Sequence, residues 1–161
     1  MRSLHDAKPK LTFSGMFAPI RLLRVQALGT ELAFDAASLC DVLALAPGHA
    51  PVRFGRGLAM SYEGRIVPLV DFRSPAGKEG AMMGSCVVVA NVQHSRFAML
   101  VDCIGEYVHV DYAAIRPPEP ALAERCPYLE GCISCAGSEV YLVDLERLLG
   151  PAIRTHLHGG G

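Results

Sequence analysis

The stretch Gly57–Phe72, GLAMSYEGRIVPLVDF, decides the fold of this chain. An apolar run leads up to Glu63-Gly64, and a second run, rich in Ile, Val and Leu, follows it. A glycine after a polar residue supplies the positive φ that a tight turn between two strands requires. The stretch therefore predicts a β-hairpin whose turn lies at Glu63-Gly64.

The same pattern returns near the C-terminus. The stretch Gly131–Leu145, GCISCAGSEVYLVDL, places Gly137 where the first stretch has Gly64, after a deletion of one residue. The Leu-Val-Asp triplet that ends at Asp71 returns with its end at Asp144. We therefore predict a second hairpin of the same kind.

Each of these hairpins follows another strand–turn–strand unit. Leu22–Leu45 has a turn at Gly29-Thr30, and Ser85–Val110 has a turn near His94-Ser95. The chain thus consists of two related halves, each with two hairpins and a link. Because two repeats are too few for an open solenoid, we predict a pair of small packed sheets or barrels.

The rest of the chain divides around this repeat. We predict a leader at 1–20, one domain at 21–150 with halves at 21–75 and 84–149, and a tail at 151–161. Within the domain, the Pro- and Gly-rich segments are connections. They are Ala46–Arg56, expected to be loop, Arg73–Gly84, expected to be an exposed link, and Arg116–Pro120, expected to be an extended connector. Asp35–Leu45 fits a helical turn or a bent strand, and Ala121–Arg125 fits one helical turn.

Composition excludes several classes of protein. A length of 161 residues suits one domain, and a net charge of −1 argues against nucleic-acid binding. No run reaches the roughly 18 apolar residues needed to span a membrane, and no secretory signal is visible. Of the six cysteines, Cys40, Cys86 and Cys103 lie in apolar runs, which predicts buried thiols in a reducing cytoplasm.

The spacing of Cys126, Cys132 and Cys135 is the one that suggests a metal site. Zinc would need a fourth ligand, such as His109 or a histidine of the tail. Residues three apart on a strand point to opposite faces, however, whereas a tetrahedral site needs convergent ligands. We therefore expect no metal and no cofactor, and we keep a metal- or thiol-dependent regulator that uses these cysteines as the alternative function.

Three aspartates, Asp71, Asp102 and Asp144, each close a short aliphatic run and could suggest acid–base catalysis. Asp71 and Asp144 occupy equivalent strand ends in the two halves, where a carboxylate can cap a turn. No nucleophile elbow, phosphate loop or dinucleotide fingerprint is present. We therefore expect no catalytic residue and no enzyme activity.

The tip of the central hairpin carries Tyr62, Glu63 and Arg65. These residues fit ordinary solvation of a turn, and they fit a contact with another protein equally well. The pattern of residues leaves both readings open.

Beyond its repeat, the chain resembles the family of CheW-like domains. The resemblance rests on Phe54-x-x-Gly57 followed by Gly64–Phe72, on Leu100–Val108 with its Leu-Val-Asp and Gly-Glu-Tyr-Val, on the Pro117-Pro118 connector, and on Tyr128–Leu145. It covers about Leu22–Leu149. It implies an all-β fold of two intertwined SH3-like five-stranded β-barrels with one or two short helices.

The resemblance also implies a function. A CheW-like protein is a cytoplasmic, non-enzymatic adaptor that couples the regulatory domain of a CheA-type histidine kinase to the cytoplasmic tips of methyl-accepting chemoreceptors, with other CheW-like domains as further partners. It binds no nucleic acid and does not insert into the membrane. Mapped onto this sequence, the receptor groove and hairpin of the family fall on Leu39, Asp41, Gly57, Tyr62, Glu63, Gly64 and Arg65.

One position departs from the family pattern. The family has Asn-Leu-Arg-Gly where this chain has Ser61-Tyr62-Glu63-Gly64, so Glu63 reverses the charge, although Arg65 follows two residues later. Because opposite charges select different partners, we infer a changed partner set, such as an array that governs surface motility or second-messenger synthesis.

Overall fold

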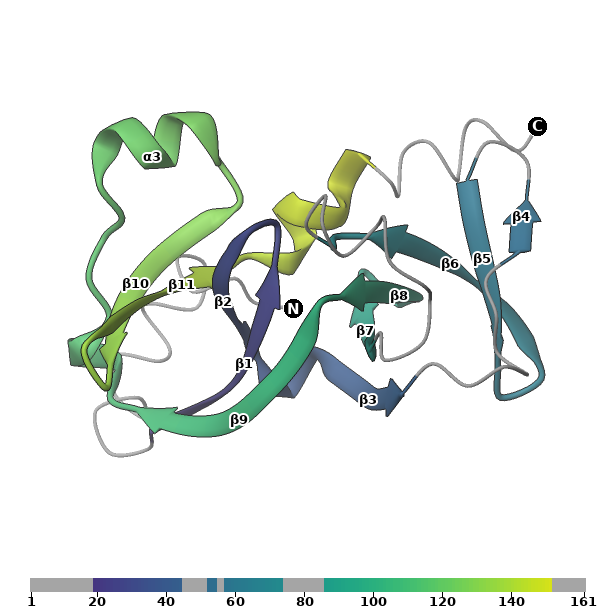
Figure 1. Ribbon diagram of the computed structural model, residues 1–161, viewed down its shortest axis with the longest axis horizontal. Helices are drawn as coiled ribbons and strands as arrows, with labels where there is room; N and C mark the ends of the chain where they lie inside the picture. Colours follow the sequence, from purple (N-terminus) through teal and green to yellow (C-terminus); the bar gives the residue numbers. More distant parts are fainter. Residues whose placement is uncertain (1–18, 45–51, 55–56, 74–85, 152–161) are drawn as a thin grey trace.

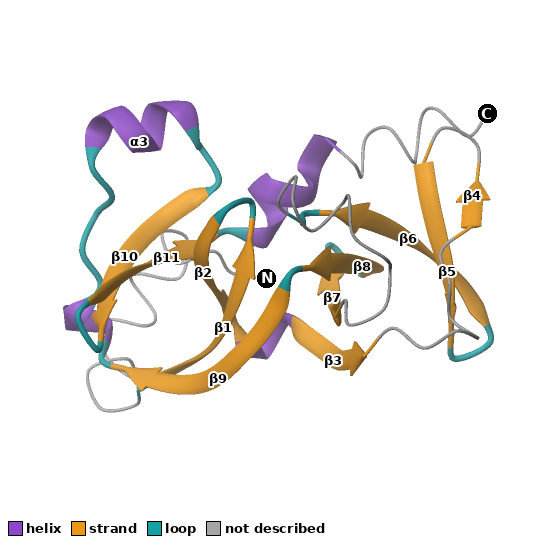
Figure 2. Ribbon diagram, viewed as in Figure 1, coloured by secondary structure: helices purple, strands orange, loops and turns teal. Residues whose placement is uncertain are grey.

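The structure is a computed structural model that describes residues 19–44, 52–54, 57–73 and 86–151, with only the backbone described at 52–54. Strands dominate it (Figures 1 and 2). In order they are β1 (Ile20–Ala27), β2 (Thr30–Asp35), β3 (Leu39–Ala44), β4 (Val52–Phe54), β5 (Gly57–Tyr62), β6 (Arg65–Asp71), β7 (Cys86–Val92), β8 (Ser95–Val101), β9 (Cys103–Val110), β10 (Leu129–Cys135) and β11 (Ser138–Val143). The helices are two 3₁₀ turns, η1 (Ala36–Ser38) and η3 (Tyr112–Ala114), the short α3 (Pro120–Arg125), and a helix at 145–151.

The strands form two sheets. One has five strands in the order β10-β11-β2-β1-β9, and the other has six in the order β3-β7-β8-β6-β5-β4. The all-β architecture is thereby confirmed. The order of each sheet is linear within the described residues, so each barrel is open, and β4 adds a sixth strand to one of them by pairing with β5.

Each sheet takes strands from both halves of the chain. The first hairpin of the N-terminal half, β1–β2, lies beside β10–β11, the second hairpin of the C-terminal half, through a parallel contact between β2 and β11. In the other sheet, β7–β8 lies beside β5–β6 through a parallel contact between β8 and β6. The crossing strands β3 and β9 complete the exchange, since each pairs with the first hairpin of the opposite half. The predicted repeat is therefore present, and its halves are interlocked.

The two-residue turns explain how these hairpins form. Both turn residues have positive φ in all four hairpins of the described chain. They are Leu28-Gly29, Glu63-Gly64, Gln93-His94 and Ala136-Gly137. Positive φ at both positions defines the type I′ turn, whose twist matches that of paired strands. The turn at Glu63-Gly64 is confirmed, whereas the turns expected at Gly29-Thr30 and His94-Ser95 lie one residue earlier.

Three apolar clusters hold the two sheets together. One lies inside each sheet, around Leu100 in the six-stranded sheet and around Ile133 in the five-stranded sheet. The largest, around Phe34, Met99 and Leu149, takes side chains from both sheets and from the helix at 145–151. Because β7 is buried on both faces, its sequence is nearly continuous valine rather than alternating.

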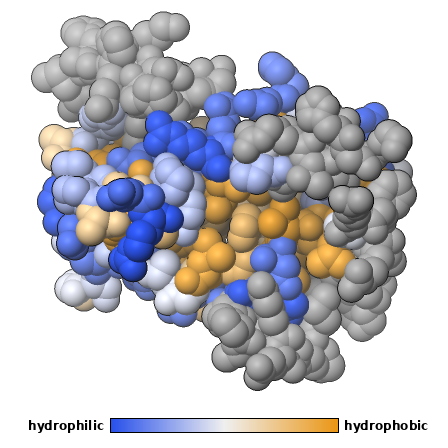
Figure 3. Space-filling model, turned by 90° about the horizontal axis from the view of Figure 1, so that it is seen from above, coloured by the Kyte–Doolittle hydropathy of each residue, from blue (hydrophilic) through white to orange (hydrophobic). Residues whose placement is uncertain are grey.

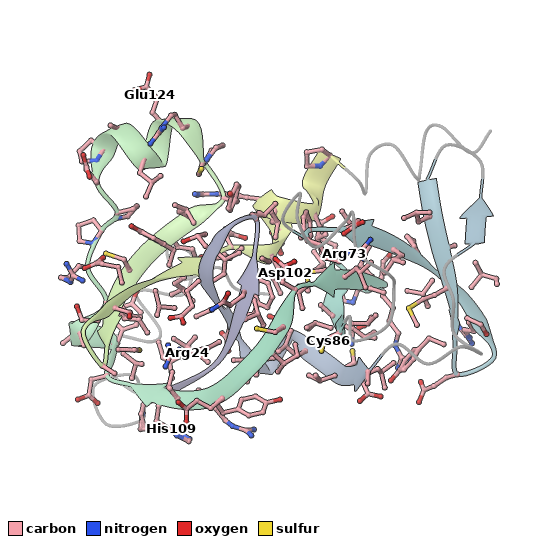
Figure 4. All side chains as sticks on the ribbon, in the orientation of Figure 1. Arg24, Arg73, Cys86, Asp102, His109 and Glu124 are labelled. Atoms are coloured by element: carbon pink, nitrogen blue, oxygen red, sulfur yellow. The ribbon has the colours of Figure 1, made fainter. Side chains whose placement is uncertain are left out.

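Backbone hydrogen bonds join the sheets at their meeting point. The Leu28 N–H donates to the Phe72 carbonyl at 2.7 Å, and the Asp102 N–H donates to the Gln26 carbonyl at 2.9 Å. Nearby, Arg73 is only 7% exposed and pairs with Asp71 at 2.9 Å. Arg73 and Asp102 lie together at this junction (Figure 4). Arg73 was expected to open an exposed link and instead belongs to the buried joint, while residues 74–84 lie outside the described part.

Other connections also differ from the expectation. Part of Ala46–Arg56, expected to be loop, is strand β4, because its backbone pairs with β5 next to the glycine-led start of that strand. Asp35–Leu45 contains both alternatives, with η1 first and β3 after it. The helix at 145–151 was not predicted, since its first residue was assigned to the preceding strand. The limits of the domain stay a prediction, and the leader at 1–18 and the tail from 152 lie outside the described residues.

Not all of the thiols expected to be buried are buried. Cys40 and Cys103 are exposed, and Cys86 is half-buried. The reason is that β3 and β9 are edge strands, so part of each faces solvent, and Cys40 lies at an irregularity in the pairing of β3 with β7. The expectation for these two thiols is wrong because an apolar run does not reveal which strand will lie at an edge.

The surface differs between the two sheets. Seen from above, hydrophilic residues dominate the side of the five-stranded sheet, and hydrophobic residues come into view towards the six-stranded sheet (Figure 3). In the part of the chain that the structure describes, no helix has the length and apolar character to cross a membrane.

Candidate protein-interaction surface

Side chains from three elements meet at the tip of the β5–β6 hairpin. Tyr62 ends β5 and Glu63 begins its turn, Asp41 comes from β3, and Arg96 comes from the start of β8. We call these four residues the hairpin cluster. β8 runs parallel to β6 in the same sheet, which is what brings Arg96 from the C-terminal half to a hairpin of the N-terminal half.

Asp41 holds the ring of Tyr62. The Tyr62 hydroxyl donates to one carboxylate oxygen of Asp41 at 2.9 Å, and the Val42 N–H donates to the other at 2.9 Å. The Tyr62 ring packs against the apolar cluster of the six-stranded sheet. Burial, and then the hydrogen bond to Asp41, raise the pKa of Tyr62 to about 12, so the phenol stays protonated as a donor at neutral pH.

Glu63 holds the guanidinium of Arg96. The two side chains form an ion pair at 2.5 Å, and they are 60% and 44% exposed. The hydrogen bond to Glu63 is the first cause that raises the pKa of Arg96. The guanidinium carbon also lies 5.6 Å from the centre of the Tyr62 ring, within the range of a cation–π contact. Asp41, Tyr62, Arg96 and Glu63 are therefore linked in one continuous chain of contacts.

The other predicted site residues are placed differently. Gly64 and Arg65 complete the same turn, and Arg65 stands opposite Tyr62 in the strand register. Leu39 lies on β3 near Asp41, but its side chain packs against the shared core. Gly57 begins β5, so it lies five residues, roughly 17 Å, from the turn. The structure thus brings five of the seven predicted residues together and leaves Leu39 and Gly57 apart from them.

Sequence reasoning missed Arg96. It lies 33 residues after Glu63, in the other half, and no motif marks it. The signal that could have located it is the repeat itself. If the halves exchange hairpins, the strand after the third turn must lie beside the central hairpin.

The remaining polar motifs have structural roles in this fold. Asp144 accepts hydrogen bonds from the N–H groups of Glu146 and Arg147 at 3.0 and 3.3 Å, which caps the helix at 145–151. Asp71 accepts two bonds from the Arg73 side chain and one from its N–H. The predicted capping of turns by the repeated aspartates is confirmed.

The three cysteines of the alternative hypothesis do not converge. Cys126 packs against the shared core, Cys135 packs against the cluster of the five-stranded sheet, and the Cys132 thiol is buried near the Pro117 carbonyl. Among the described residues, no group of three His, Cys, Asp or Glu side chains is arranged to hold a metal ion. His156 and His158 lie outside those residues. No observation in the described structure favours the alternative.

Comparison with known proteins identifies the family. The family model of the CheW-like domain matches residues 21–152, which is most of the chain. The chain belongs to the CheW-like domain family. No curated protein matches the chain significantly in sequence.

A solved structure supports the fold of this CheW-like domain. The chain is similar to the scaffolding protein TtCheW from Thermoanaerobacter tengcongensis, with a TM-score of 0.64 and 15% sequence identity. The match covers 78% of this chain and 88% of the other. The expected fold, two intertwined SH3-like barrels, is therefore confirmed, although the barrels are open and one has six strands.

Proposed function

We propose that this CheW-like domain is a non-enzymatic adaptor that couples a CheA-type histidine kinase, through the regulatory domain of the kinase, to the cytoplasmic tips of methyl-accepting chemoreceptors. The observation that carries this proposal is the match of the family model over residues 21–152. The family is one of scaffolds without enzymatic activity. We place the protein in the cytoplasm, at membrane receptor arrays, with other CheW-like domains as further partners.

The architecture suits a scaffold. Two sheets share one apolar core, so the body is rigid and can present separate surfaces at the same time. Modest contacts on such surfaces add up when many copies are tethered in one array, because tethering raises the effective concentration of each partner.

The partner-binding residues proposed on this body are Leu39, Asp41, Gly57, Tyr62, Glu63, Gly64 and Arg65. The exposed tip of the β5–β6 hairpin supports the proposal, since an exposed pair such as Glu63 and Arg96 is available to another protein. Because Glu63 reverses the charge of the family pattern, we propose a partner set that differs from the standard flagellar array, as in an array for surface motility or second-messenger synthesis.

Affinity co-purification from the native cell, followed by reconstitution, tests the function. We expect a chemosensory kinase and a chemoreceptor to be recovered together, and the purified chain to change the autophosphorylation rate of that kinase only when a receptor fragment is present. Recovery of neither protein, or a kinase rate that ignores the chain, would contradict the adaptor function.

A further inference from the structure

The hairpin cluster has more hydrogen-bond donors than it uses. A guanidinium carries five N–H donors. Among the described residues, Arg96 has one hydrogen bond, from Nη1 to Glu63. Arg65, exposed on the same turn, has no hydrogen bond or ion pair with any residue that the structure describes. Two cations of this surface therefore keep donors that face solvent.

The acids of the surface are already engaged. Asp41 accepts from the Tyr62 hydroxyl with one oxygen and from the Val42 N–H with the other. Glu63 accepts from Arg96. The formal charges of Asp41, Glu63, Arg65 and Arg96 cancel, but the unused capacity is all on the donor side. A partner gains most here by supplying acceptors.

The geometry of the cations fits a carboxylate. Arg65 pairs across the hairpin with Tyr62, so their side chains lie on one face, and Arg96 lies against the Tyr62 ring. The two guanidinium groups thus flank the same ring. Arginine binds carboxylates through two parallel N–H bonds, and a guanidinium that is already held loses less entropy on binding.

We propose that Arg96 and Arg65 form a carboxylate-binding site at the hairpin tip, and that the partner docking there inserts an acidic side chain between them. This inference rests on the proposed adaptor function and names the chemistry of the partner. Arg96 is a specificity-determining residue of this site. Glu63 and Tyr62 are positioning residues, since Glu63 fixes one edge of the Arg96 guanidinium and the Tyr62 ring, anchored by Asp41, supports it.

The roles differ in what substitution does. Arg96→Ala removes charge-assisted hydrogen bonds to the partner, so we expect affinity to fall about 10- to 100-fold. Arg96→Lys keeps the charge but loses the planar fork, so it restores only part of the affinity. Glu63→Gln frees the guanidinium without removing it, and we expect a loss of only about two- to fivefold.

The experiment measures binding of the full-length chain to the CheA-type kinase and to a receptor cytoplasmic fragment from the same genome, each separately, over a series of salt concentrations. The matched control is Arg116→Ala. Arg116 and Glu139 form an ion pair at 2.8 Å with exposures of 51% and 49%, which resembles the Arg96–Glu63 pair but lies on the other sheet. Thermal unfolding of each variant confirms that the fold is intact.

The expected result is that Arg96→Ala and Arg65→Ala weaken one of the two partners and flatten its dependence on salt, while Arg116→Ala does neither. The double variant Glu63→Ala/Arg96→Ala should bind like Arg96→Ala alone, because Glu63 acts through Arg96. A rise of affinity in Arg96→Ala, or an affinity within twofold of the wild type for both partners, would overturn the carboxylate site and leave the adaptor function intact. If the wild type itself bound neither partner, both proposals would fall.

Discussion

Single residues at equivalent positions of the two halves have separate structural roles. Asp71 pairs with the buried Arg73 where the sheets meet, and Asp144 caps the C-terminal helix. Both accept a backbone N–H two residues ahead, which is the shared function of the repeated Leu-Val-Asp triplet. The motif indicated a capping carboxylate, but the structure on the C-terminal side of each cap depends on the neighbouring chain.

The Asp144 cap makes a quantitative prediction. Asp144→Ala leaves the N–H groups of Glu146 and Arg147 without an acceptor and loosens a helix whose Leu145 and Leu149 belong to the shared core. We expect the free energy of unfolding to fall by about 1–2 kcal/mol, as measured by urea denaturation. Asp144→Asn, which keeps an acceptor, should lose less. Equal losses for the two variants would mean that the hydrogen bonds of the cap are not the cause.

At the scale of elements, the four hairpin turns share one backbone geometry with different residues. Three of them place glycine second, whereas the β7–β8 turn places Gln93 and His94 at φ values of 51° and 66°. A side chain with positive φ costs roughly 1–2 kcal/mol in the left-handed region. The sequence signal of a glycine was therefore absent at this turn, and this contributed to its prediction one residue too late.

This turn offers a stabilising substitution. His94→Gly removes the left-handed strain, and part of the gain is offset by the greater entropy of the unfolded chain. We expect the free energy of unfolding to rise by about 0.5–1 kcal/mol, with a higher Tm in calorimetry. The mirror control is Gly137→Ala at φ 83°, where an added Cβ meets no atom within 4 Å, so only the backbone is strained and stability should fall. A lower Tm for His94→Gly would show that the His94 side chain makes a contribution that outweighs its strain.

At the scale of the whole molecule, the exchange of hairpins makes the halves interdependent. Neither half contains a complete sheet, because each sheet combines a first hairpin from one half with a second hairpin from the other. The shared core also takes side chains from both sheets. Folding of one half without the other would leave its apolar faces exposed to water.

The interdependence predicts fragment complementation. Residues 1–75 and 76–161, produced as separate peptides, should each lack a cooperative unfolding transition and should regain one when mixed at equal concentration. Far-UV circular dichroism during thermal unfolding measures this directly. The intact chain serves as the reference and should unfold in a single transition. A cooperative transition in either peptide alone would mean that a half can form a sheet by itself.

The sequence by itself determined the repeat, the hairpins and the all-β class, because these depend on local periodicity and on turn residues close together in the chain. The resemblance of its motifs identified the family and located Asp41, Tyr62, Glu63 and Arg65. Only the tertiary structure decided which strands lie at edges, and so that Cys40 is exposed. It also decided that Arg96 joins the hairpin cluster. Both depend on pairing between strands far apart in sequence, which no local pattern encodes.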